Sequence, residues 1–386
     1  MGKSLIVATI TLSLISVVVT SAFAQELSND ELLARITKLE EKLAGQTNNE
    51  TKTNPALSSL AQRISFNGLI EVEGVYGKTN FDEPTLNDED SSDITLATVE
   101  LGVDVAIAKH VSGHVVLLWE EDSDESVEVD EGFILIDGEE RFPAYLRAGK
   151  FYLPFGNFTS NMVSDPLTLE LGEINESAVE IGFKQGGFYG AVYFFNGDID
   201  EEGQDSHVDN YGATVGYTLE QENFNVDVGA HYINNLIDSD GWGDHFEEEV
   251  DAAALNNDTL ELNDYVDGFG AHIVIDIANF TLIGEYIGAL DDPEYLLNGI
   301  KIKGDAIAAW NTEVCYTFDV AERETSVAIA YQGSDDAGDF IAESRYVAAA
   351  SVAVIDYTTV SLEYLHEKFE NDDKSDIVTA QLAIEF

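Results

Sequence analysis

The sequence predicts an all-β fold, a transmembrane antiparallel β-barrel of about sixteen strands with a short N-terminal coiled-coil helix. Three observations indicate it. From Ile64 to Phe386, apolar residues recur at every second position over segments of about ten residues. Short and long connections alternate between these segments, as turns and external loops do in bacterial barrels. The formal net charge is -56, which acidic loops in water carry more easily than a compact soluble domain does.

The N-terminus has the features of a cleavable signal peptide, residues 1–24. Lys3 precedes an apolar run, and Ala22 and Ala24 are the small residues that a signal peptidase reads. A membrane anchor is the alternative, but the run is shorter than the roughly 20 residues of a spanning helix. We therefore expect a secreted chain that begins at Gln25.

The segment 25–46 has the spacing of a short coiled coil. Its apolar residues recur four, three and four positions apart, and they are Leu32, Ile36, Leu39 and Leu43. Fewer than two heptads are marginal as an isolated helix, so we expect this helix to pack on partner chains in a homotrimer. The alternative is a helix that lies against its own barrel. Residues 47–63 read as a polar linker.

The barrel is expected over residues 64–386. Its predicted strands lie near 64–73, 98–107, 111–120, 127–136, 144–150, 178–185, 188–196, 209–219, 223–234, 265–277, 280–290, 306–318, 324–332, 344–354, 358–366 and 378–386. Long connections are predicted at 77–93, 150–177, 197–208, 235–264 and 291–304. An even strand number returns the C-terminus to the side where the chain began, as outer-membrane barrels of Gram-negative bacteria require.

Alternation also divides the strand residues between lipid and lumen. Leu101, Leu382 and Ile384 are predicted to face lipid, whereas Gln381 and Glu385 face inwards. The carboxylates predicted on the lumen side are Glu71, Glu73, Glu100, Asp104, Glu128, Asp130, Glu180, Asp227, Asp276, Glu285, Glu313 and Glu363. For any one of these, a solvated polar wall is the plain interpretation, because barrel lumens are polar.

The connection 150–177 is too apolar for a solvated loop. Pro154 and Gly156 end the preceding strand, and several large apolar side chains follow. We expect it to be the third external loop, folded into the lumen, with basic wall residues facing Glu170 and Glu173. The predicted constriction and solute-binding residues are Arg147, Lys150, Phe155, Glu170, Glu173, Glu180, Lys184 and Arg345.

The connection 235–264 contains a weak match to a calcium-binding loop. Asp238, Asp240, Asp244 and Glu249 take ligand positions, but Trp242 stands where an oxygen ligand belongs. The alternative is a disordered acidic loop. No cofactor is predicted, and Ca²⁺ on the acidic external loops is the one open alternative.

Other functional classes are disfavoured by composition. An acidic chain does not attract nucleic acid phosphates, and the single Cys315 provides neither a disulfide nor a cysteine metal site. No catalytic spacing of Ser, His and Asp, and no phosphate-binding glycine loop, is present, so we expect no enzyme. The expected partners are outer-membrane lipid and lipopolysaccharide, together with a small solute.

Two segments resemble a known family. The sequences GKFYLPFGNF at 149–158 and SDPLTLELGEINESAVEIGF at 164–183 are similar to those of LbtU-type siderophore porins, the outer-membrane legiobactin-receptor-like porins. The resemblance implies uptake of a ferric siderophore or similar small solute by TonB-independent facilitated diffusion. A general cation-preferring diffusion porin is the alternative, and a structural or adhesin barrel is a further one. The acidic charge would repel an anionic ferric complex, so either bound cations screen the loops or the solute is neutral or cationic.

Overall fold

The computed structural model describes residues 63–82, 87–121, 127–138, 142–203 and 207–386. The predicted signal peptide, coiled coil and nearly all of the linker lie outside the described residues. Sixteen strands form the barrel: β1 (Ile64–Asn80), β2 (Glu89–Ala108), β3 (Val111–Trp119), β4 (Glu128–Asp137), β5 (Ala144–Tyr152), β6 (Asn175–Gln185), β7 (Phe188–Phe195), β8 (Asn210–Gln221), β9 (Phe224–Ile233), β11 (Gly268–Ile277), β12 (Phe280–Ala289), β15 (Ala308–Val320), β16 (Arg323–Asp335), β17 (Ser344–Ile355), β18 (Thr358–Lys368) and β19 (Lys374–Glu385). The remaining elements are α4 (Leu167–Gly172), α5 (Asp240–Leu255), β10 (Leu260–Asp264), β13 (Glu294–Leu297) and β14 (Ile300–Lys303).

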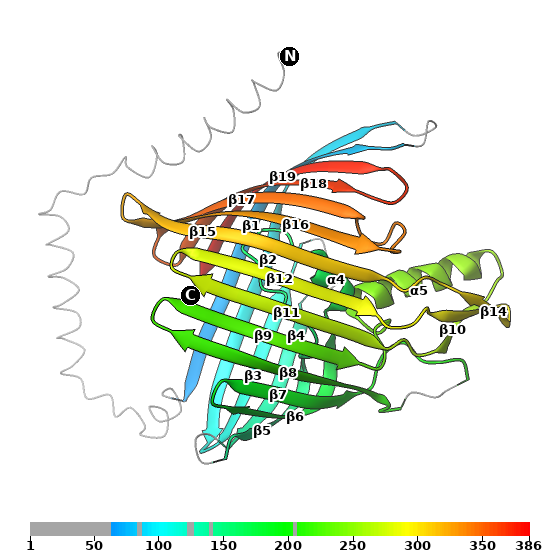
Figure 1. Cartoon of the computed structure of the whole chain (residues 1–386), viewed down its shortest axis with the longest axis horizontal. Coiled ribbons are helices and arrows are strands. Elements are labelled where there is room, and N and C mark those ends of the chain that lie inside the picture. The colour runs from blue at the N-terminus through cyan, green and yellow to red at the C-terminus, as the bar shows by residue number, and fades with distance from the viewer. Residues whose placement is uncertain (1–62, 83–86, 122–126, 139–141, 204–206) are drawn as a thin grey trace, which may run out of the picture. The chain divides into compact units, whose positions relative to one another are not determined.

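The barrel is closed and antiparallel (Figure 1). Its first strand β1 pairs with β2 on one side and with the last strand β19 on the other. Each barrel strand corresponds to one of the sixteen strands expected from sequence, so the predicted fold class is confirmed. The elements β10, β13 and β14 form a separate three-stranded sheet within the long connections.

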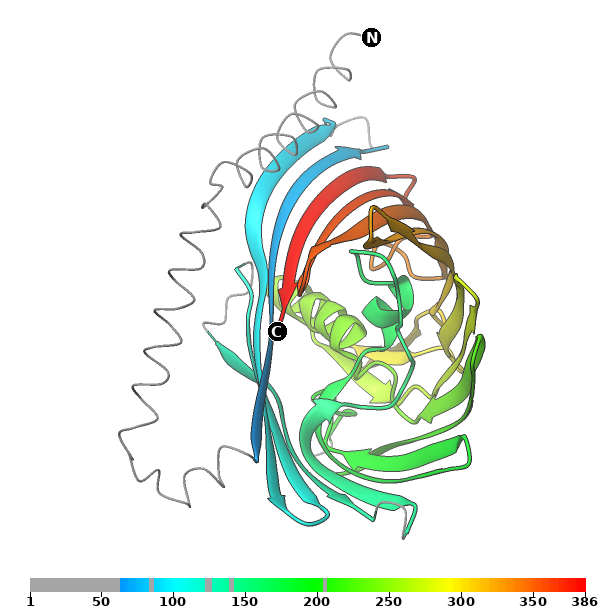
Figure 2. The same cartoon turned by 90° about the vertical axis from the view of Figure 1, so that its left-hand side faces the viewer.

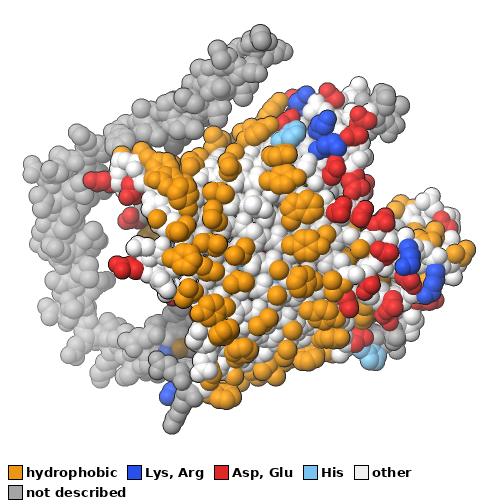
Figure 3. Space-filling view, viewed as in Figure 1, with side chains coloured by type: hydrophobic (Ala, Val, Ile, Leu, Met, Phe, Trp, Pro, Cys, Tyr) orange, Lys and Arg blue, Asp and Glu red, His pale blue; other side chains and the backbone are white. Residues whose placement is uncertain are grey.

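The outer surface carries an apolar belt between two polar ends. In Figure 3, apolar side chains cover the middle of the visible wall, and acidic side chains gather at the end that carries the long connections. Neighbouring positions differ as alternation predicts: Ile181 is 54% exposed on the outside, whereas Glu180 is 1% exposed on the inside. Among the described residues, no helix is both long and apolar enough to cross a bilayer.

The first connection is shorter than expected. Strands β1 and β2 continue their pairing beyond the apolar segment, from Tyr76 opposite Ser92 to Thr79 opposite Glu89. The predicted connection 77–93 therefore contracts to residues 81–88. The prediction placed the strand ends where apolar alternation stops, but backbone pairing continues through the polar residues that follow.

We expect arginine at Leu101 to destabilise the barrel by roughly 2 to 4 kcal/mol, because this outward side chain lies in the apolar belt. The measurement is a folding titration in lipid vesicles, with Glu100→Arg on the lumen side as the matched control. Equal stability of the two variants would contradict the assigned faces. Gly102 is unsuitable as the control, because the Asn67 side chain already occupies the space that a side chain there would need.

Candidate functional site

The connection between β5 and β6, residues 153–174, lies inside the barrel, and we call it the lumenal loop. Figure 2 looks into the ring of strands and shows α4 within it, whereas Figure 1 shows α5 beside β10 and β14 at the end of the barrel that carries the long connections. Phe155, Leu167 and Leu171 of this loop are at most 1% exposed. A Cβ at Gly172 would approach the Ile287 side chain on β12 closely, so α4 lies directly against the wall. Apolar burial therefore holds the loop against the inner wall, at a gain of roughly 1.5 to 3 kcal/mol for each large side chain.

Three wall carboxylates bind the lumenal loop. Glu285 on β12 accepts a hydrogen bond from Asn157 N at 2.6 Å. Glu313 on β15 accepts one from Asn161 N at 2.9 Å. Glu363 on β18 accepts one from Val163 N at 2.6 Å. These carboxylates are buried rather than solvated, so the plain interpretation of a solvated wall is wrong for all three. They satisfy backbone donors that the irregular loop leaves without partners of its own.

Arg345 on β17 fastens the loop by charge. Its guanidinium group lies 2.9 Å from Glu170 of α4 and 2.5 Å from Glu367 of β18, and it also donates to the Asp165 carbonyl oxygen at 2.9 Å. The Arg345 side chain is 9% exposed. One buried cation is therefore shared between one carboxylate of the loop and one of the wall.

Of the three basic wall residues expected to face Glu170 and Glu173, Arg345 pairs with Glu170. The predicted constriction in which Arg147 or Lys184 faces these two carboxylates does not form. Arg147 pairs with Glu180 on the adjacent strand, with Nε 2.9 Å from Glu180 Oε2. Lys184 lies one residue before the end of β6, at the short turn that leads into β7. Strand register determines which side chains lie next to Arg147 and Lys184, and this register cannot be read from residue spacing along the chain.

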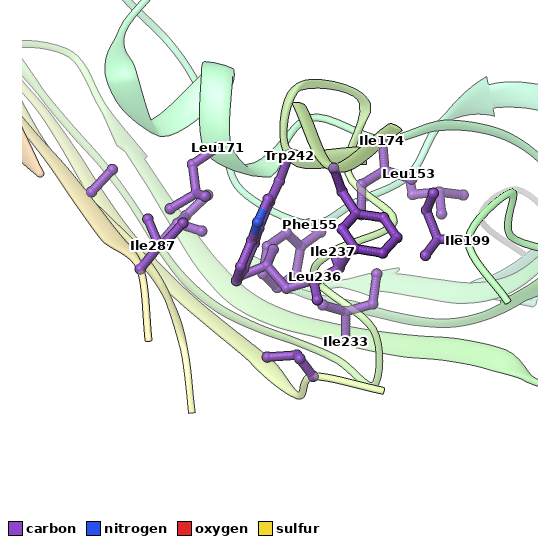
Figure 4. Packing of buried hydrophobic residues seen from close by; sticks show 14 of the residues in the cluster. Leu153, Phe155, Leu171, Ile174, Ile199, Ile233, Leu236, Ile237, Trp242 and Ile287 are labelled. Carbon is purple, nitrogen blue, oxygen red and sulfur yellow. The ribbon is translucent and has the colours of Figure 1, made fainter. Parts of the chain in front are cut away.

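The predicted calcium loop is also not formed, and neither is the disordered alternative. Helix α5 starts at Asp240 and includes Asp244 and Glu249, so these side chains do not wrap around one point. Trp242 and Phe246 are instead 2% and 5% exposed, because they pack in the apolar cluster with the lumenal loop. Figure 4 shows Trp242 among Leu171, Phe155 and Ile237. Trp242, which occupies a ligand position of the predicted calcium loop without an oxygen to offer, is thus part of the apolar core.

Beside this core lies a cavity of about 570 Å³, which we call the acidic chamber. It is bounded by β3 to β6, the end of the lumenal loop and the start of α5. Ten carboxylates line it: Glu120, Glu128, Asp130, Glu173, Glu176, Asp198, Asp238, Asp240, Asp244 and Glu247. The described lining also includes one base, Lys150, and the neutral residues Leu118, Tyr152, Asn175, Ile199, Ser239 and Gly243.

The chamber thus unites residues from two separate sequence predictions. Lys150 and Glu173 come from the predicted constriction, and Asp238, Asp240 and Asp244 come from the predicted calcium loop. Phe155 lies in the apolar core instead, and Glu249 is not among the lining residues. The contribution of the 196–209 connection, through Asp198, was not predicted, since nothing in the sequence indicates that it meets α5.

Crowding of carboxylates changes their acidity. Burial, followed by the nearby charges of Asp240, Asp165 and Asp130, raises the pKa of Glu173 to about 8. Burial likewise raises the pKa of Asp238 to about 7, although backbone N–H donors oppose the shift. Glu173 and Asp238 are therefore partly protonated near neutral pH, and a bound cation would favour their ionised forms.

Closed topology, apolar belt and lumenal loop together define a porin-type barrel of the Gram-negative outer membrane. Solved structures share the fold: the outer-membrane channel DcaP of Acinetobacter baumannii has a TM-score of 0.56 at 13% identity, covering 84% of this chain and 97% of that one. For OprB of Pseudomonas putida the TM-score is 0.55 at 9% identity, covering 86% and 96%.

The chain is also similar in sequence to UPF0422 proteins. It is 29% identical to one from Coxiella burnetii, over 79% of this chain and 64% of that protein. It is 28% identical to one from Legionella pneumophila strain Lens, over 75% and 58%. The matches thus span about three fifths of the length of these relatives. No protein-family model matches the sequence.

Proposed function

We propose that the protein is an outer-membrane diffusion porin that prefers cationic small solutes. The acidic chamber carries this proposal, because ten carboxylates and a single lysine line it. A lining of one charge sign raises the local concentration of ions of the opposite sign and excludes ions of the same sign. Arg345 and Arg147 do not offset this preference, since each is already paired with carboxylates.

Uptake of a ferric siderophore is the narrower candidate, and it comes from the resemblance of residues 149–158 and 164–183 to siderophore porins. The chamber limits it to complexes that are neutral or positively charged, because an anionic complex would be repelled. An adhesin is less well supported, since it has no use for three wall carboxylates that fasten a loop inside the barrel.

The test of the proposed function is ion selectivity. Purified protein in planar bilayers, under a KCl gradient, should give a reversal potential that indicates a higher permeability for K⁺ than for Cl⁻. Neutral, cationic and anionic ferric siderophores, each added to one side, test siderophore uptake separately. A complex that passes through the channel should reduce the K⁺ current, and a complex that does not enter should leave it unchanged. A preference for Cl⁻ would overturn the proposal.

Cation preference should also depend on pH. The pKa of Glu173 is about 8, above its usual value, so this carboxyl is mainly neutral at pH 7 and becomes charged as the pH rises to 9. We expect the K⁺ preference to increase from pH 6 to pH 9, above the range in which ordinary carboxyls titrate. In Glu173→Gln this increase should be smaller, and reversal potentials at each pH measure it. An identical pH dependence in the variant would exclude Glu173 as the titrating group.

A further inference from the structure

We propose that the acidic chamber is a binding site for a linear polyamine, a solute in which several ammonium groups are joined by methylene chains. This inference rests on the proposed cation-preferring function and assigns a solute class to it. It follows from an incompletely satisfied buried carboxylate, from the arrangement of the charges and from the lining of the chamber.

Asp238 and Ser239 are buried side chains of the chamber lining with unused hydrogen-bonding capacity. Asp238 is 6% exposed and Ser239 is 1% exposed. Asp238 Oδ1 accepts hydrogen bonds from Asp198 N at 2.8 Å and Ile199 N at 2.9 Å, which fix the carboxylate in place. Its Oδ2 atom and the Ser239 hydroxyl have no hydrogen-bond partner within the described ranges. A buried carboxylate oxygen without a partner is costly, and an ammonium group would supply the missing donors.

The chamber charges are spread along its wall rather than gathered at one point. Asp238 is close to Glu176 and Asp198. Glu173 is close to Asp240 and to Asp130 of β4. Within the described part of the chain, no three His, Cys, Asp or Glu side chains are close enough together to hold a metal ion. A calcium ion needs six to eight oxygen ligands at about 2.3 to 2.6 Å. Successive ammonium groups several bonds apart match the spread charges better than a single ion does.

Size and lining agree with such a solute. The volume of about 570 Å³ lies in the range of roughly 300 to 1,000 Å³ that is usual for small-molecule sites. Leu118, Ile199 and the Tyr152 ring provide apolar surface among the carboxylates. Methylene segments between the ammonium groups could contact these side chains, which a hydrated inorganic cation could not use.

Spermidine is the probe, with butylamine as a control that carries one ammonium group and a similar methylene chain. Isothermal titration calorimetry on the full-length protein in detergent should show spermidine binding at least tenfold more tightly than butylamine. Asp238→Asn should weaken spermidine binding at least fivefold, while the remaining carbonyl oxygen can still accept the two backbone hydrogen bonds. Asp319→Asn makes the same charge change at an exposed site near the C-terminal end of β15, and Asp319 is not among the residues that line the chamber. This variant should leave binding unchanged.

Equal affinity for spermidine and butylamine, or unchanged binding in Asp238→Asn, would overturn the polyamine site. Displacement of spermidine by an equimolar amount of Ca²⁺ would also overturn it and indicate a metal site. Reversal potentials on the same preparations separate the two proposals: a cation-selective channel without spermidine preference contradicts the polyamine site alone. A channel without cation selectivity contradicts the proposed function, whatever the calorimetry shows.

Discussion

Replacing Glu285 with alanine is expected to release part of the lumenal loop and increase the single-channel conductance. The Glu285 carboxylate accepts hydrogen bonds from Asn157 N at 2.6 Å, Phe158 N at 3.2 Å and Thr168 Oγ1 at 2.8 Å. Hydrogen bonds to a charged group contribute about 1.5 to 3 kcal/mol each, and the donors would lose their acceptor in a buried site. We expect the local stability of the loop to fall by about 3 kcal/mol or more, while the wall strands stay paired.

Conductance in planar bilayers and limited proteolysis together measure this release. New cleavage near Phe158, combined with a larger conductance, is the expected result. Asp276→Ala is the control: this wall carboxylate on β11 accepts a hydrogen bond from Thr281 on β12, and the described loop residues do not bind it. If Glu285→Ala matched the wild type in both measurements, the Glu285 hydrogen bonds would not be needed to hold the loop, and its apolar contacts and the bonds to Glu313, Glu363 and Arg345 would suffice.

The barrel could be predicted from sequence because a strand in a bilayer has few alternatives. Its backbone must pair with neighbours and one face must be apolar, so period-two alternation determines both the existence and the faces of strands. Ile181 outside and Glu180 inside follow directly from this rule. The interior position of the lumenal loop follows from a related argument, because Phe155 and Leu171 needed an apolar surface to cover them.

The functional site was less predictable, because it depends on which residues meet across the lumen. Asp198, Glu173 and Asp238 belong to three different connections, and nothing along the chain relates them. One feature had a local signal: Trp242 and Phe246 are four residues apart, the spacing that places two side chains on one face of a helix. The calcium interpretation considered the acidic residues of this segment, Asp238, Asp240, Asp244 and Glu249, and missed the apolar face.

Arg345→Ala is expected to destabilise the protein by about 3 to 5 kcal/mol, the usual cost of removing one partner from a buried ion pair. The substitution leaves Glu170 and Glu367 facing each other without a cation, and the Asp165 carbonyl oxygen loses a donor. Urea titration of the refolded protein, followed by tryptophan fluorescence, measures the change. Lys301→Ala is the matched control, because its ion pair with Glu294 is exposed and should contribute little.

A second variant separates lost charge pairing from lost packing at Arg345. In the triple variant Arg345→Met, Glu170→Gln and Glu367→Gln, the site is neutral and of similar volume, so most of the stability should return. Recovery in the triple variant, with a large loss in Arg345→Ala, would show that uncompensated carboxylates cause the destabilisation. If Arg345→Ala were as stable as the wild type, hydration or protonation of Glu170 and Glu367 would be enough to stabilise them without a cation. Arg345 would then not be needed to hold the loop.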